Sequence, residues 1–97
     1  MKTVRVDERA RREAREATER YAERGRMLGR RFRDELLAAL FYAASHPLSC
    51  SPYLHGTRSA FLKKFPYFVI FLDWEGLIFV VAVAHAKRRE GYWKARI

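Results

Sequence analysis

Residues Phe65–Ala84 read FPYFVIFLDWEGLIFVVAVA, two apolar runs separated by Asp73–Gly76. A stretch of roughly 20 apolar residues would be long enough to cross a bilayer. The charges of Asp73 and Glu75 fall at its centre, where a membrane makes them costly, and the glycine that follows is typical of a turn. The stretch therefore predicts a β-hairpin, and we expect neither a membrane span nor a membrane partner.

A third strand is predicted immediately before this hairpin. The run TRSAFL, residues 57–62, is separated from the hairpin only by Lys63 and Lys64, so the three runs predict an antiparallel meander. The preceding residues 46–56, HPLSCSPYLHG, contain two prolines, serines and a glycine. Such a composition is typical of a loop, and we expect no core residues from it.

The first half of the chain predicts a strand and a first helix. Lys2–Val6 alternates polar and apolar residues, as a short strand does, and Asp7 then offers an N-cap. A helix is predicted over Glu8–Arg24, with a narrow stripe of alanines and Tyr21 at helical spacing and its many charges in solvent. We expect Gly25 to end it in the left-handed conformation.

A second helix is predicted from about Met27 until Pro47 ends it. Its broader apolar face consists of Leu28, Phe32, Leu36, Leu37, Leu40 and Phe41. The short connection forces the two helices to pack antiparallel, and the alanine stripe permits a close approach. The order β-α-α-β-β-β predicts a single α+β domain over residues 1–97, with the helical hairpin packed on one face of the sheet.

Composition agrees with one folded domain. The chain has 97 residues, of which 49% are hydrophobic and 32% charged, unlike a disordered chain. The N-terminus has no apolar stretch typical of a secretory signal, and one cysteine, Cys50, excludes an internal disulfide. We therefore expect a cytoplasmic protein.

The net charge of +9 predicts an acidic partner, such as a nucleic acid or an acidic protein. The excess is least compensated in Pro47–Ile97, with 8 basic and 3 acidic residues. The segment His85–Arg96, HAKRREGYWKAR, carries cations next to aromatic rings, a combination that suits RNA. The candidate RNA- or phosphate-binding residues are Arg58, Lys63, Lys64, Lys87, Arg89, Trp93, Lys94 and Arg96.

Three residues of this segment are candidate catalytic groups. His85 could move a proton near neutral pH, Tyr92 could do so if neighbouring cations lowered its pKa, and Arg88 could stabilise the charge of a phosphorane. The alternatives are a charged tail, a hydrogen-bonded structural histidine, and an aromatic pair, Tyr92 and Trp93, that closes the core. His46, Cys50 and His55 lack a fourth zinc ligand. We predict metal-free acid–base chemistry with no metal and no cofactor.

Three longer motifs together resemble a known family. They are LGRRFRDELLAAL (Leu28–Leu40), RSAFLKKFPYFVIF (Arg58–Phe71) and AVAHAKRREGYWKAR (Ala82–Arg96). In this order the chain resembles the RelE/ParE superfamily of toxins from bacterial type II toxin–antitoxin modules. The resemblance implies two helices on a twisted antiparallel sheet that the N-terminal strand joins.

The resemblance also implies a target. RelE-like members cut mRNA in the ribosomal A site with a cluster of Lys, Arg and a C-terminal Tyr or His, whereas ParE-like members poison DNA gyrase. Tyr92 matches the tyrosine of the nuclease branch, Arg88 falls near its C-terminal arginine, and His85 resembles its histidine. Ser59, Phe61 and Phe68 instead stand where RelE has cations.

We therefore predict a RelE-like, ribosome-dependent mRNA endonuclease that inhibits translation. The alternatives are a non-enzymatic ParE-like gyrase poison and a catalytically degenerate homologue. The expected partners are a cognate antitoxin, acidic and disordered until it wraps the toxin around its helical hairpin, and either the ribosome with mRNA or DNA gyrase.

Overall fold

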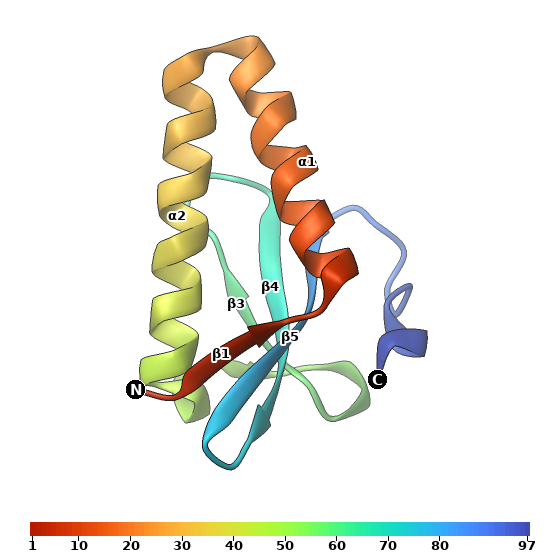
Figure 1. The fold of residues 1–97 in the computed structure, drawn as a ribbon. Coiled ribbons are helices and arrows are strands. Elements are labelled where there is room, and N and C mark those ends of the chain that lie inside the picture. The colour runs from red at the N-terminus through yellow and green to blue at the C-terminus, as the bar shows by residue number, and fades with distance from the viewer.

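The computed structural model describes residues 1–97 as two helices packed on a five-stranded sheet (Figure 1). The predicted order of elements is confirmed, with one additional short strand, β2. The elements are β1 (Thr3–Val6), α1 (Glu8–Arg24), α2 (Arg26–Ser45), β2 (Ser51–Pro52), β3 (Arg58–Phe61), β4 (Tyr67–Trp74) and β5 (Leu77–His85), with short 3₁₀ turns at Pro47–Ser49, Leu54–Gly56 and Lys94–Arg96. No helix combines the length and the apolar character needed to span a bilayer.

The sheet is mixed, which corrects the expected all-antiparallel arrangement. Its strand order is β1-β5-β4-β3-β2, and β1 pairs with β5 in parallel. The helical hairpin returns the chain to the start of β1, where Lys2 donates its backbone N–H to Ala44. From there β3, β4 and β5 alternate in direction, so that β5 runs the same way as β1 and lies beside it.

Residues 46–56 contribute more structure than their loop-like composition predicts. Ser51 and Pro52 form β2, which pairs with Ser59 and Arg58 at the edge of the sheet. Cys50 is buried in the core, and Tyr53 packs on the far face of the sheet. The prediction that no core is built there was therefore wrong, because prolines at an edge strand still allow neighbouring side chains to turn inward.

The helical hairpin confirms the predicted cap and close approach. Asp7 accepts a hydrogen bond from the Arg9 backbone N–H at 2.8 Å, as an N-cap should. A Cβ on Gly29 would lie 2.7 Å from Cβ of Ala22, so the helices meet where only glycine fits. Gly25 is extended (φ 167°) and not left-handed, because α2 starts directly at Arg26.

Both faces of the sheet are covered by apolar side chains. The helix-side cluster includes Phe32, Leu36, Tyr67, Phe71 and Val80, whereas Leu37 and Phe41 of the predicted apolar face are exposed. The far-side cluster consists of Phe68, Ile70, Val81, Ala82, Ala84 and Trp93. The pairing shifts at a bulge, because Ile70 pairs with Ala82 and Phe71 with Val80. The extra residue, Val81, thereby joins Ala82 on the far side.

Candidate functional site

The C-terminal segment, residues 86–97, turns back along the sheet on the side away from α2 (Figure 1). Trp93 anchors it and is only 1% exposed. Its ring lies 6.1 Å from that of Tyr53 and 5.8 Å from that of His55, centroid to centroid. Trp93 thus closes the far-side cluster, and its ring is enclosed rather than offered to a base.

Glu13 of α1 holds this segment in place. Its Oε1 accepts hydrogen bonds from the Val83 backbone N–H and from Nη1 of Arg96, both at 3.0 Å. Its Oε2 accepts from the Tyr92 hydroxyl at 2.7 Å and from Nη2 of Arg96 at 3.0 Å. We refer to Glu13, Tyr92 and Arg96 as the Glu13 network.

The Glu13 network hydrogen-bonds the part of β5 that has no neighbouring strand on this edge. β1 pairs with β5 only as far as Val80, so the β5 backbone beyond it has no strand partner on that edge. Arg96 donates to the carbonyl of Val81 at 3.1 Å, and Glu13 accepts the N–H of Val83. Both side chains are nearly buried, with 11% and 14% exposed, so these bonds satisfy groups that water would otherwise have to reach.

These contacts leave Tyr92 poorly prepared for proton transfer. Burial and its hydrogen bond to Glu13 raise the pKa of the phenol above its usual value of about 10. The Arg88 guanidinium lies 3.8 Å from the centre of the ring. The hydroxyl therefore stays protonated and already donates its hydrogen to a carboxylate.

His85 and Arg88 do come together, around a small polar cavity of about 300 Å³. Nδ1 of His85 accepts the Lys87 backbone N–H at 3.0 Å, and the ring packs against Tyr67. Arg20 donates to the Tyr67 hydroxyl at 2.7 Å. The cavity is lined by Glu13, Glu16, Arg20, Tyr67, Val83, His85 and Arg88. Its two carboxylates, Glu13 and Glu16, balance the charges of Arg20 and Arg88, so the cavity has no excess of positive charge for a phosphate.

The predicted phosphate-binding cations do not form one cluster. Arg58 donates to the carbonyl of Cys50 at 2.9 Å, and Arg96 belongs to the Glu13 network. Lys63 and Lys64 give their backbone N–H groups to Oε1 of Glu35, at 2.8 and 3.0 Å. The residues with exposed positions are Lys63, Lys64, Lys87, Arg89 and Lys94.

An aromatic pair occupies two of the positions at which the resemblance to RelE implies cations. Phe61 stacks on Phe68 with ring centroids 4.6 Å apart and an interplanar angle of 12°. Phe68 is buried, whereas Phe61 is 63% exposed. Ser59, the third such position, is buried. The central strands thus present an apolar surface at the place where a phosphate would need positive charge.

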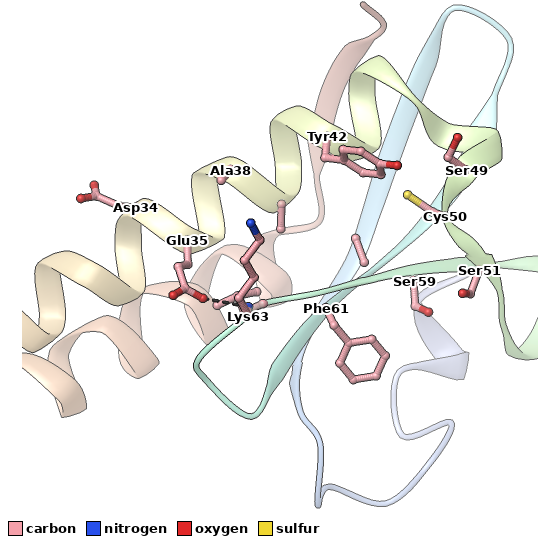
Figure 2. Close-up of a pocket in the computed structure, with 13 residues that line it drawn as sticks. Asp34, Glu35, Ala38, Tyr42, Ser49, Cys50, Ser51, Ser59, Phe61 and Lys63 are labelled. Carbon is pink, nitrogen blue, oxygen red and sulfur yellow. Dashed lines mark hydrogen bonds between the residues drawn. The ribbon is translucent and has the colours of Figure 1, made fainter.

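Two grooves flank α2. The larger one, about 670 Å³, lies between α2 and β3, and Figure 2 shows Tyr42 and Cys50 near one end and Glu35 beside Lys63 at the other. The smaller one, about 340 Å³, lies between α1 and α2. Its apolar floor includes Leu36, Leu37 and Leu40, and Arg11, Arg15 and Arg33 are also among its lining residues.

Glu13 and Arg20 contribute to the site although the charge pattern of α1 predicts a solvated helix face for them. Both continue the spacing of the buried alanines of α1, because Ala10, Glu13, Ala17 and Arg20 follow one another at intervals of three and four residues. Charged residues within such a stripe were the available signal. No group of three or more His, Cys, Asp or Glu side chains is arranged to hold a metal ion.

Comparison with known proteins supports the resemblance. Among solved structures, the fold is similar to a chain titled "Chromosomal ParDE TA system from P. aeruginosa", with a TM-score of 0.78 and 12% identity over 90% of this chain and 98% of that one. No curated protein sequence matches significantly. Residues 4–90 match the family described as "ParE toxin of type II toxin-antitoxin system, parDE". The chain therefore belongs to the ParE toxin family, within the RelE/ParE superfamily.

Proposed function

We propose that this chain is a toxin that inhibits DNA gyrase, and not the ribosome-dependent mRNA endonuclease that its C-terminal tyrosine first suggests. The observation that carries the proposal is the state of Tyr92. Its hydroxyl is bound to Glu13, and its pKa is raised rather than lowered. A proton-transfer role needs the opposite shift, toward the pH at which the enzyme works.

Two further features support the gyrase alternative. The match to the ParE family covers most of the chain, and ParE-like members of the superfamily are the gyrase poisons. The nuclease cluster would also need cations on the central strands, where this chain has Phe61 and Phe68. Inhibition of gyrase requires a docking surface and no acid–base group.

A second candidate function, RNA cleavage at His85, has one observation in its favour. His85 and Arg88 line the same cavity, so an imidazole and a guanidinium lie where a phosphodiester could approach. Glu13 and Glu16 line that cavity too, and they weaken this candidate because they balance the charges of Arg20 and Arg88 and leave no excess of positive charge for a phosphate.

An antitoxin is the expected regulatory partner, as in any type II module. The groove between α1 and α2 suits it, because an apolar floor lies beside three arginines and a single glutamate, Glu19. An acidic, amphipathic segment that folds on binding would match both properties.

The test is to assay the purified protein on two targets in parallel. With purified bacterial gyrase, relaxed plasmid and ATP, we expect supercoiling to be inhibited. On ribosomes programmed with mRNA, we expect no new mRNA ends. Cleavage by the wild type that His85→Ala abolishes, with supercoiling unaffected, would reverse the proposal in favour of the nuclease.

A further inference from the structure

Phe61 presents an exposed aromatic ring next to the β3–β4 turn. Its ring points away from α2 in Figure 2, and it is 63% exposed although it belongs to a strand. Stacking on Phe68, which packs in turn against Tyr53, fixes the ring. A rigid, exposed aromatic side chain on a packed base is typical of an interface anchor.

Exposed cations lie at the same end of the sheet as this aromatic pair, although the Lys63 side chain points toward α2 in Figure 2. Phe68 pairs with Ala84, so the turn after β3 and the segment after β5 lie at the same end of the sheet. The backbone N–H of Ala86 donates to the carbonyl of Pro66 at 2.7 Å and ties the two together. They carry Lys63, Lys64, Lys87 and Arg89 at exposed positions, with Glu90 as the one acidic residue of either segment.

The backbone beside Phe61 indicates a protein partner rather than RNA. β3 pairs with β4 along its whole length, but β2 covers only Arg58 and Ser59 of its other edge. The strand is therefore open beside Ala60 and Phe61, where a peptide could hydrogen-bond. RNA could use the rings and the lysines, but it has no use for an open strand edge.

We propose that Phe61, with the exposed cations Lys64, Lys87 and Arg89 at the same end of the sheet, is the anchor by which the toxin docks on an acidic, apolar surface segment of gyrase. This inference rests on the proposed function. It separates the two partners by place, because Phe61 does not line the α1–α2 groove assigned to the antitoxin and its ring stacks on Phe68 of the far-side cluster.

The chain offers a matched control for this docking surface. Phe41 of α2 is 60% exposed, lies outside the α1–α2 groove and belongs to neither apolar cluster. Phe61→Ala and Phe41→Ala therefore remove the same exposed ring from two different places. Neither substitution should unfold the protein, because both side chains are mostly exposed.

The experiment measures the toxin concentration that halves supercoiling by purified gyrase. We expect Phe61→Ala to raise it at least about tenfold, as loss of an anchor does, and Phe41→Ala to leave it within about twofold. The double variant Lys64→Glu/Lys87→Glu should also weaken inhibition, and more strongly at low salt than at high salt.

Three results would overturn the proposal. If the wild type inhibits gyrase and Phe61→Ala inhibits it equally well, the docking site is elsewhere while the proposed function stands. If the wild type does not inhibit gyrase, the proposed function fails together with this inference. If Phe61→Ala instead abolishes cleavage of mRNA on ribosomes by the wild type, the aromatic pair is an RNA platform.

Discussion

The two faces of the sheet are covered in different ways. On one face, α1 and α2 enclose a cluster of 16 buried residues together with the sheet, whereas on the other the C-terminal segment closes a cluster of six. The first cover is regular and rests on apolar packing. The second is irregular and rests on one tryptophan and on the Glu13 network. Stability should therefore be shared unequally between the faces.

The largest effect is expected from Phe32→Ala. Phe32 is fully buried, and its ring packs within about 5 Å of those of Tyr21, Phe65 and Tyr67. Loss of such a ring costs about 3–5 kcal/mol of a total of about 5–15 kcal/mol. Denaturant unfolding followed by circular dichroism measures it, with the exposed Phe41→Ala as control. An unchanged midpoint for Phe32→Ala would place the ring outside the core.

Trp93→Ala tests the other face, and we expect a smaller loss of about 3 kcal/mol, at the lower end for a large aromatic side chain. The 3₁₀ turn at Lys94–Arg96 and the loop before it can move toward the sheet and fill part of the space. The same unfolding experiment gives the value. A loss of unfolding free energy equal to that of Phe32→Ala would mean that the C-terminal segment is as rigid as the helical hairpin.

The sequence alone predicts the helix-covered face well, because its signals are periodic. The interrupted apolar run predicts the β4–β5 hairpin, and Asp7 marks the start of α1. The direction of β1 could not be predicted locally. It depends on the number of reversals between β1 and β5, and the short strand β2 was hidden by its proline.

The far face and the candidate site were less predictable, because side chains from distant positions build them. Glu13 and Tyr92 are 79 positions apart, and the sequence around neither residue predicts its contact with the other. Composition correctly indicated a basic C-terminal segment. It could not reveal that Arg96 pairs with Glu13, that Arg58 donates to the carbonyl of Cys50, or that Phe61 stacks on Phe68.

Glu13→Gln should destabilise the packing of the C-terminal segment on the far face without unfolding the helix-covered face. We expect it to lower the free energy of unfolding by about 2 kcal/mol. Removing one partner of a fully buried ion pair costs about 3–5 kcal/mol, and this pair is partly exposed. An amide would also present a donor where Tyr92 and Arg96 both donate. Hydrogen exchange at the Val83 amide should accelerate most. The control is Glu16→Gln, on an exposed position of the same helix; equal protection of Val83 in both variants would refute the role of Glu13.

Tyr92→Phe should have the smallest effect on stability, about 1 kcal/mol, because it removes one hydrogen bond and keeps the ring under Arg88. The folded protein raises the pKa of this phenol, so the folded state favours the neutral form. Its contribution to stability is therefore complete below the unfolded pKa of about 10 and is lost as the pH rises through the folded pKa. Unfolding measured from pH 8 to 11 should show a steeper loss in the wild type than in Tyr92→Phe, although burial also raises the pKa of Tyr21 and Tyr53 in both proteins.

The same variant separates a structural tyrosine from a catalytic one. If Tyr92 belongs only to the cover of the far face, Tyr92→Phe inhibits gyrase and arrests growth as the wild type does. A catalytic hydroxyl would behave differently, since general acid–base catalysis is worth about 10² to 10⁴ in rate and its loss would abolish growth arrest in a folded protein. Loss of toxicity in Tyr92→Phe, with a melting temperature close to that of the wild type, would indicate that the Tyr92 hydroxyl is catalytic and that the target is RNA.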